Sequence, residues 1–417
     1  MIVPPPLRDD CFTLPAGVDW LPAEHALELL RNAMHPQVAK MYVELGGAMG
    51  RILAEDIMAP ANSPPYANSA IDGYGYLGVQ SEDSEVIRLS LMRGRAAAGH
   101  PFKGDVPEGY AVKVMTGAIL PKGVDTVVLQ EDVNADAHEI AFRGPIKAGK
   151  NTRSAGEDIK SGQILFTKGR KIRAPDLAVL ASVGISQLIV YEPLRVGILS
   201  TGDELTEPGD PARVGQIYDA NRPMLTGQMA QLGYTVVDLG CAADDVETLR
   251  LILDSASERC DALVTTGGAS AGDEDHMSAL LRDSGSLEMW RIAVKPGRPM
   301  AMGLWNGLPV FGLPGNPVAA MVCKLVFTQP ALRALAGGTW RMPQSYDVAA
   351  AFEKLKKYGR REYLRARIRN GRAEVFPSEG SGRITGLSWA EGLVELSEPA
   401  RDIKIGDKVR YIPFSEF

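Results

Sequence analysis

The sequence predicts a multidomain α/β protein whose central domain is a doubly wound, mostly parallel sheet. From residue 193 to 338, short apolar runs typical of buried strands alternate with helical patterns. Two other stretches, 76–149 and 340–417, show alternating β character between Gly, Pro and Asp clusters instead. The length of 417 residues and the apolar content of 45% allow roughly two to four packed domains.

Changes of pattern set the predicted domain boundaries. Apolar residues recur at helical spacing over 22–34, and a second amphipathic piece over 50–57 ends at a proline cluster. Helical character returns over 174–184, with Pro175 near its start and Gly184 at its end. We predict a discontinuous N-terminal domain (19–60 and 150–192), an inserted small β domain (61–149), an α/β domain (193–338) and a C-terminal β-barrel (339–417).

Composition argues against several functional classes. Charged residues make up 23% of the chain and the net charge is −6, which disfavours a nucleic-acid-binding surface across the whole chain. No signal peptide is apparent, and no apolar run approaches the roughly 20 residues that cross a bilayer. The cysteines lack metal-ligand spacing and are expected to be small buried hydrophobes in a reducing cytosol. They are Cys11, Cys241, Cys260 and Cys323. We expect a cytoplasmic protein that binds neither nucleic acid nor membrane.

One strand-to-helix turn carries the clearest chemical signal. The apolar run 261–264 leads into the stretch 265–275, TTGGASAGDED, before a helical pattern over 276–282. Glycines let backbone N–H groups converge on an oxyanion, and the helix N-terminus adds partial positive charge. Asp273 and Asp275 place carboxylates beside that position, so a phosphate there requires a cation such as Mg²⁺. The alternative is a glycine-rich loop with solvated acids.

Further polar turns are expected at the same edge of the sheet. Ser200-Thr201-Gly202 follows a buried strand, and ligands of doubly wound folds lie beyond the carboxyl ends of the strands. Asn316 and Pro317 define the start of a helix that continues to about residue 336. The five histidines form no ligand cluster, and no convincing Ser/His/Asp set is present. The residues therefore favour oxyanion chemistry that depends on positioning and charge.

Four motifs, taken in order, closely resemble the molybdopterin molybdenumtransferases, a family that includes bacterial MoeA and the gephyrin E-domain. They are NSAIDGY (68–74), STGDEL (200–205), TGGASAGD (266–273) and LPGNPV (313–318). The resemblance implies insertion of molybdate into adenylylated molybdopterin, with release of AMP and formation of molybdenum cofactor. It also implies a homodimer, a MogA/MoaB-like central domain and an upstream molybdopterin adenylyltransferase. Tungstate has nearly the same size and charge as molybdate, so either oxyanion fits.

The resemblance also assigns residues of a cleft. Asp72 matches a functionally essential acid, and the catalytic candidates are Asp72, Glu204, Asp275 and Lys295. Our hypothesis is that Glu204, Asp273 and Asp275 hold Mg²⁺, while Lys295 and neighbouring arginines attract molybdate. The sequence does not distinguish which of the acids is a metal ligand and which is a general base. The expected substrate-binding residues are Thr116, Asp158, Ser200, Thr201, Gly202, Asp244, Gly267, Gly268, Ser270, Arg291, Arg298, Pro314, Pro317 and Ser381.

Departures from the family pattern are conservative. Arg291 and Arg298 stand where relatives often carry Lys, which keeps the charge but changes hydrogen-bond geometry. Ile71 replaces the commoner Met at similar volume.

Two alternatives come from other functional classes. Stand-alone forms of the adenylyltransferase that shares the α/β module lack the Asp72 domain and the C-terminal β segment, so the full architecture argues against that activity. A paralogue acting only as a pterin-binding or scaffold protein is expected to have lost the cleft acids, which are present here. The insertase is therefore the favoured interpretation.

Overall fold

The computed structural model describes residues 20–78, 86–267, 276–283, 287–297, 299–380 and 382–417. The chain forms two compact units. The first comprises Met1–Met41, Gly50–Ala54 and Val190–Phe417, and the second comprises Tyr42–Met49 and Glu55–Ile189.

A six-stranded sheet forms the centre of the first unit, in the order β16-β13-β17-β21-β20-β18. The neighbouring pairs among its first four strands are parallel, and β20 and β18 add antiparallel pairs at one side. The strands are β16 (Thr235–Ala242), β13 (Arg195–Thr201), β17 (Ala262–Thr266), β21 (Leu308–Leu313), β20 (Pro299–Trp305) and β18 (Leu287–Arg291). This arrangement confirms the predicted mostly parallel sheet.

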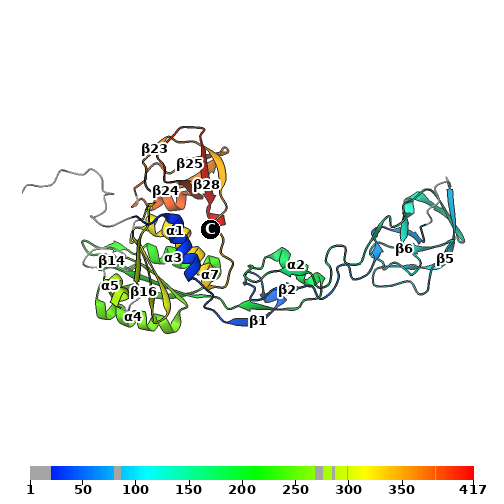
Figure 1. Cartoon of the computed structure of the whole chain (residues 1–417), viewed down its shortest axis with the longest axis horizontal. Helices are drawn as coiled ribbons and strands as arrows, with labels where there is room; N and C mark the ends of the chain where they lie inside the picture. Colours follow the sequence, from blue (N-terminus) through cyan, green and yellow to red (C-terminus); the bar gives the residue numbers. More distant parts are fainter. Residues whose placement is uncertain (1–19, 79–85, 268–275, 284–286, 298, 381) are drawn as a thin grey trace, which may run out of the picture. The chain divides into compact units, whose positions relative to one another are not determined.

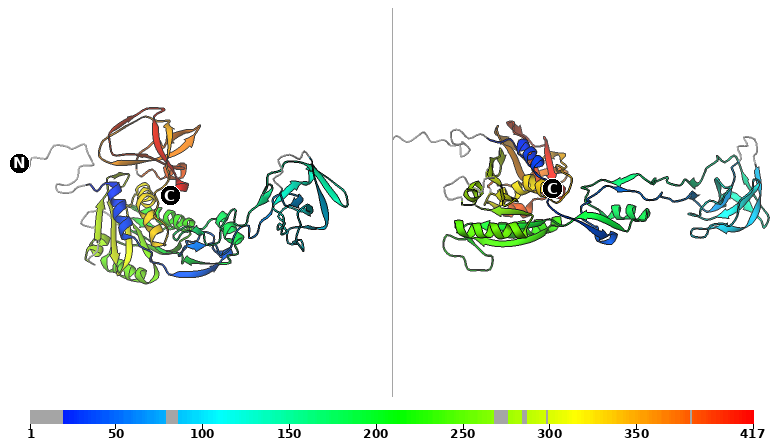
Figure 2. Two further views of the ribbon diagram at one scale, coloured as in Figure 1. Left: turned by 45° about the vertical axis from the view of Figure 1, so that its right-hand side comes forward. Right: turned by 60° about the horizontal axis from the view of Figure 1, so that its bottom comes forward.

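Helices cover both faces of this sheet, as Figures 1 and 2 show. Val196 and Ile198 pack into a core with helices α1 (Ala23–Ala33) and α3 (Asn221–Leu232). Leu199, which points to the other face, packs into a second core with α4 (Val246–Arg259) and α5 (His276–Asp283). The sheet is therefore doubly wound, as predicted.

The helix after β21 begins where the sequence predicts. Asn316 Oδ1 accepts hydrogen bonds from the N–H groups of Val318 (3.1 Å) and Ala319 (3.4 Å), and Pro317 takes the first helical position. Segments α6 (Pro317–Cys323), a π-helical turn (Lys324–Thr328) and α7 (Gln329–Leu335) follow one another directly. The whole helix is long and apolar enough to cross a membrane, but 94% of its apolar window is buried inside the protein, as expected of a core helix.

The C-terminal strands close into the predicted barrel. Strand β24 (Arg361–Arg369) pairs with β25 on one side and β26 on the other, and β22 and β28 complete the ring. These strands are β25 (Arg372–Val375), β26 (Gly392–Leu396), β22 (Tyr346–Ala350) and β28 (Lys408–Pro413). Outside the ring, β23 (Lys354–Lys356) pairs with β27 (Arg401–Ile403), and the short helix α8 (Thr385–Trp389) was not predicted.

Two short strands, not one continuous strand, lie between α5 and β20. The chain forms β18 and then β19 (Val294–Lys295), which pairs with β24 of the barrel. Leu21 causes the interruption: its N–H donates to Arg291 O (3.0 Å), and its carbonyl accepts from the N–H of Ala293 (2.8 Å). Because these backbone groups are already paired, the sheet ladder ends at Arg291.

The second unit contains a six-stranded sheet in the order β7-β4-β6-β5-β9-β8. Its strands are β7 (Thr126–Leu129), β4 (Gly73–Tyr76), β6 (Tyr110–Val114), β5 (Val86–Ala96), β9 (Glu139–Arg143) and β8 (Val133–Ala135). Shorter elements are α2 (Ala174–Ser182), β2 (Ile57–Met58), β3 (Asn68–Ser69), β10 (Thr152–Arg153) and β11 (Ile164–Phe166). The inserted β domain is thus confirmed as a fold element, while the four domain boundaries stay predictions.

The amphipathic piece predicted over 50–57 is not a helix. Ile52 O accepts a hydrogen bond from Tyr191 N–H (2.8 Å), Leu53 forms a β-bridge with Val190, and Ile57 begins β2. Pairing with distant backbone therefore overrides a short helical periodicity. The remaining elements are β1 (Lys40–Glu44), β12 (Gln187–Tyr191), β14 (Leu205–Thr206), β15 (Ile217–Tyr218) and the 3₁₀ turns Leu45–Gly47, Gln130–Asp132 and Phe414–Glu416.

Candidate functional site

In the second unit, Asp72 and Thr116 lie together. Asp72 Oδ1 accepts hydrogen bonds from the N–H and the hydroxyl of Thr116, both at 2.7 Å. Gly73 follows at the start of β4, where a Cβ atom would lie 1.9 Å from Val128 O of the neighbouring strand. Only glycine fits there, so the Asp-Gly pair fixes where the strand begins and where the acid is placed.

The environment of Asp72 favours its ionised form. The backbone N–H of Thr116, then its hydroxyl, and to a smaller extent the charge of Lys113 lower the pKa of Asp72 below its ordinary value. The residue is half-buried. Asp158, the other predicted site acid of this unit, lies in a different loop, where its N–H donates to Ser63 O (3.1 Å).

In the first unit, the carboxyl edge of the sheet brings four predicted residues together. Ser200 and Thr201 end β13, and their hydroxyls are buried without a partner among the described residues. Gly202 (φ +146°) and Gly267 (φ +89°) lie in the left-handed region. A Cβ atom would lie 2.1 Å from Thr201 O at Gly267 and 2.5 Å from Glu204 Oε2 at Gly202. The backbone and the Glu204 carboxylate therefore converge on one small region.

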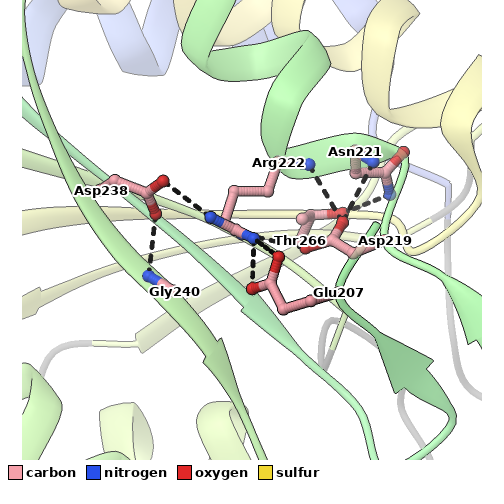
Figure 3. A network of polar contacts seen from close by, with 7 residues as sticks. All are labelled: Glu207, Asp219, Asn221, Arg222, Asp238, Gly240 and Thr266. Atoms are coloured by element: carbon pink, nitrogen blue, oxygen red, sulfur yellow. Dashed lines mark hydrogen bonds and ion pairs between the residues drawn. The ribbon is translucent and has the colours of Figure 1, made fainter. Parts of the chain in front are cut away.

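A buried asparagine that the sequence analysis did not single out joins this edge to Pro314. Asn221 Nδ2 donates to Thr266 Oγ1 and to Gly315 O, both at 2.7 Å. The Thr266 hydroxyl in turn donates to Pro314 O (3.3 Å). The signal that could have found it is the Asp219-Ala220-Asn221 sequence at a helix start, where Asx residues commonly bond backbone. Figure 3 shows Asn221 with Thr266 and with the Asp219 and Arg222 side chains at the same helix start.

Asp244 also lies at the start of an element near this edge. Its N–H donates to Asp203 Oδ1 (3.1 Å), which connects the segment after β13 with the segment after β16. Asp245, the next residue, caps α4 by accepting from Thr248 N–H (2.8 Å). Asp244 is therefore held by its backbone one residue before the cap.

Lys295 lines a cavity of about 160 Å³ that also includes barrel residues. Its Nζ lies 2.7 Å from Glu379 Oε2 and 3.7 Å from Glu362 Oε2. Lys354 pairs with the same two acids, at 3.1 Å from Glu362 Oε2. Burial opposes the charge of Glu379, but hydrogen bonds from Lys295 and Lys354 lower its pKa overall.

Both signs of charge line the cavity: Arg365, which donates to Ser378 O (2.6 Å), adds to the two lysines, and Glu353 adds to Glu379. Lys354, Arg365 and Glu379 were not predicted as site residues, although Glu379 lies two residues before the predicted Ser381. Arg291 ends β18, partly buried.

Six predicted site residues lie outside the described part of the chain: Gly268, Ser270, Asp273, Asp275, Arg298 and Ser381. Over the ranges that the structure does describe, no group of three or more His, Cys, Asp or Glu side chains is arranged to hold a metal. Glu204 nevertheless fits a hard cation, because its carboxylate lies against the Gly202 backbone near buried, unpartnered hydroxyls.

Comparison with family models gives matches along most of the chain. Residues 21–184 match the "MoeA N-terminal region (domain I and II)". Residues 197–334 match the "Probable molybdopterin binding domain", and residues 348–414 match the "MoeA C-terminal region (domain IV)".

Similar proteins of known name and structure match over nearly the same extent. A molybdopterin molybdenumtransferase of Haemophilus influenzae is 35% identical over 382 residues, covering 90% of this chain and 94% of that protein. Molybdopterin molybdenumtransferase 2 of Mycobacterium tuberculosis is 32% identical over 390 residues, 88% of this chain and 93% of that protein. A molybdopterin biosynthesis MoeA protein of Pyrococcus horikoshii superposes with a TM-score of 0.82 at 28% identity. The match covers 95% of this chain and 100% of that protein's chain.

Proposed function

Because the chain belongs to the molybdopterin molybdenumtransferase family and is an enzyme of that class, we propose that it inserts molybdate into adenylylated molybdopterin and releases AMP. The observation that supports this reaction best is the carboxyl edge of β13 and β17. Buried hydroxyls of Ser200 and Thr201 lack partners among the described residues, and two glycines keep side chains away from them.

This edge is suited to a phosphate. Hydroxyl and backbone N–H groups donate hydrogen bonds, and their burial strengthens each bond to an anion. We place the phosphates of adenylylated molybdopterin there, where the phosphoanhydride bond is hydrolysed: a water oxygen bonds to the AMP phosphorus as the molybdopterin phosphate leaves. The hydroxyls and glycine loops orient that bond and stabilise the negative charge that develops on it.

Mg²⁺ is part of the proposal. Glu204 would contribute one carboxylate, and Asp273 and Asp275 the others, although those two aspartates lie outside the described residues. When bound, the ion would supply positive charge beside the bridging phosphates. Glu204 would also serve to orient the segment that follows Gly202.

The cavity at Lys295 is suited to the second substrate. Molybdate is a small dianion, and Lys295, Lys354 and Arg365 can offer it positive charge once a carboxylate such as Glu379 gives up its ion pair. We propose that Lys295 exchanges its ion pair with Glu379 for molybdate oxygens. Asp72, held ionised, is the catalytic candidate of the second unit and can accept a hydrogen bond or bind a cation.

We further propose that the enzyme works in the cytoplasm as a homodimer and receives its pterin substrate from a molybdopterin adenylyltransferase. The family resemblance supports these points. Light scattering of the purified chain tests the dimer, and a mass of a single 44.8 kDa chain would contradict it.

Reconstitution tests the reaction. Purified protein is mixed with adenylylated molybdopterin, molybdate and Mg²⁺, and AMP release is followed, with the Asp72→Asn variant alongside. Molybdate-dependent AMP release that the variant loses is the expected result. Tight pterin binding without AMP release would instead indicate the pterin-binding or scaffold paralogue.

A further inference from the structure

Asn221, the first residue of α3, occupies a buried position between two loops of the sheet edge. We propose that Asn221 is a positioning residue: its side-chain amide holds the end of β17 at Thr266 and the turn after β21 at Gly315 in the arrangement that receives the pterin phosphates. The proposal rests on the proposed function, because it assigns those loops to the phosphate of adenylylated molybdopterin.

One nitrogen atom makes both connections. Asn221 Nδ2 donates to Thr266 Oγ1 and to Gly315 O at 2.7 Å each, which uses both of its hydrogens. The two loops are neighbours, since a Cβ atom at Gly315 would contact Gly267 Cα at 3.8 Å. Gly267 in turn lies against Thr201 O, so the amide acts directly behind the proposed phosphate site.

Asparagine is the residue that this geometry requires. A carboxylate at the same place could not donate to Gly315 O and would repel that carbonyl. Asn221 Oδ1 is buried and has no partner among the described residues, which costs stability. Retaining such a group beside a proposed binding edge is consistent with a role in function rather than in packing alone.

A second set of bonds fixes Asn221 itself. Asp219 Oδ1 accepts from the N–H groups of Asn221 (3.2 Å) and Arg222 (3.1 Å) at the start of α3. The Arg222 guanidinium bonds Asp219 Oδ2 (3.2 Å), Asp238 Oδ2 (2.7 Å) and the Glu207 carboxylate. Figure 3 shows that these contacts converge on the helix start from separate segments, so the amide extends from a rigid base.

Loosening this amide should therefore displace the loops without removing any group that touches substrate. We expect Asn221→Asp to raise KM for adenylylated molybdopterin about tenfold to a hundredfold. KM for molybdate should change less than about twofold, because the cations at Lys295 are retained. Thr266→Val, which removes one acceptor, should act in the same direction, and Thr266→Ser should restore wild-type values.

The matched control is Asp254→Ala. Asp254 lies on α4 of the same domain and accepts hydrogen bonds from Trp305 Nε1 (2.8 Å) and Asn306 Nδ2 (3.3 Å). This variant loses one part-buried and one exposed hydrogen bond, both made by side chains other than those that Asn221 joins. If Asp254→Ala lowers Tm as much as Asn221→Asp yet keeps both KM values, the effect of Asn221 is one of position. KM losses that simply follow Tm in both variants would overturn the proposal.

Hydrogen exchange of the protein without substrate gives an independent test. Asn221→Asp should speed exchange of the amides over 312–316, while Asp254→Ala should not. Unchanged KM together with unchanged exchange in Asn221→Asp would overturn the proposal. Wild-type protein without molybdate-dependent AMP release would instead overturn the proposed function, and the exchange result alone would then decide the role of Asn221. Should Asn221→Asp fail to fold, the Thr266→Val and Thr266→Ser pair tests the same hydrogen bond.

Discussion

Thr116 donates its backbone N–H and its hydroxyl to the same carboxylate oxygen of Asp72, each over 2.7 Å. The two residues are 44 positions apart in the sequence, yet the fold brings them into direct contact. Because both bonds favour the carboxylate over the neutral acid, Thr116 lowers the pKa of Asp72.

Replacing Thr116 by Val should raise the pKa of Asp72 toward its ordinary value of 3.8. The hydroxyl bond would be lost and the backbone bond kept, so the shift should be partial. The pKa of Asp72 is lower in the folded protein than in the unfolded chain, so the two hydrogen bonds stabilise the fold fully at pH values above 3.8. This stabilisation is lost as the pH falls through the pKa of the folded state. Titration of the carboxyl carbon by NMR measures this, with Thr116→Ser as the control. An identical pKa in wild type and Thr116→Val would contradict the role given to the hydroxyl.

Replacing Lys295 by Met should raise KM for molybdate at least about tenfold, because a cation of the cavity is removed. Affinity for adenylylated molybdopterin should change little. Steady-state AMP release at varied molybdate measures the first, and pterin fluorescence titration the second. Lys122→Met, which removes an exposed lysine paired with Asp105, is the control. An unchanged KM for molybdate would show that Lys295 does not bind this substrate.

Replacing Asp176 by Asn should destabilise the second unit at neutral pH. Hydrogen bonds from Arg170, and then from Arg173, lower the pKa of this buried carboxyl from 3.8 to about 2 against the effect of burial. The lowered pKa of Asp176 stabilises the folded protein by about 2 kcal/mol at pH values above the ordinary pKa of 3.8. This stabilisation is lost as the pH falls from about 4 to about 2. Urea unfolding at pH 7 and pH 3 should therefore show a gap between wild type and variant that narrows at pH 3. A gap that does not depend on pH would contradict this account.

Replacing Arg222 by Met should lower the free energy of unfolding by about 3 kcal/mol, because Asp219, whose side chain is 1% exposed, would be buried without its cation. Adding Asp219→Asn to this variant should recover part of the loss, since it removes the unpaired charge. Denaturant unfolding of the two variants measures both effects. If the double variant is less stable than Arg222→Met, the charge of Asp219 is not the cause.

Much of the fold follows from local pattern. The helix after β21 is fixed by Asn316 and Pro317, whose roles are set by residues next to them, so its start could be predicted. The stretch 50–57 could not, because its conformation is decided by Tyr191 and Val190, which are far away in sequence. Local periodicity reports propensity, whereas long-range pairing determines the outcome when the segment is short.

The candidate site divides in the same way. The glycine-rich turns after β13 and β17 can be identified from their composition, and the structure brings Ser200, Thr201, Gly202 and Gly267 together. Asn221 has only the general signal of an Asx residue at a helix start, and Lys354 has none, because their importance comes from the contacts that the fold creates. A single asparagine or lysine has the same sequence appearance whether it is solvated or central.

Because β19 pairs with β24, Lys295 belongs to the C-terminal barrel, although its place in the chain suggests the central sheet. Val294 and Lys295 follow a strand of the central sheet, but their backbone ladder runs along Arg361 and Glu362 of the barrel. The position of the Lys295 backbone is therefore set by its pairing with the barrel strand β24. Sequence changes that tilt the barrel would relocate this cation, so selectivity among oxyanions could drift during evolution without any substitution in the cavity itself.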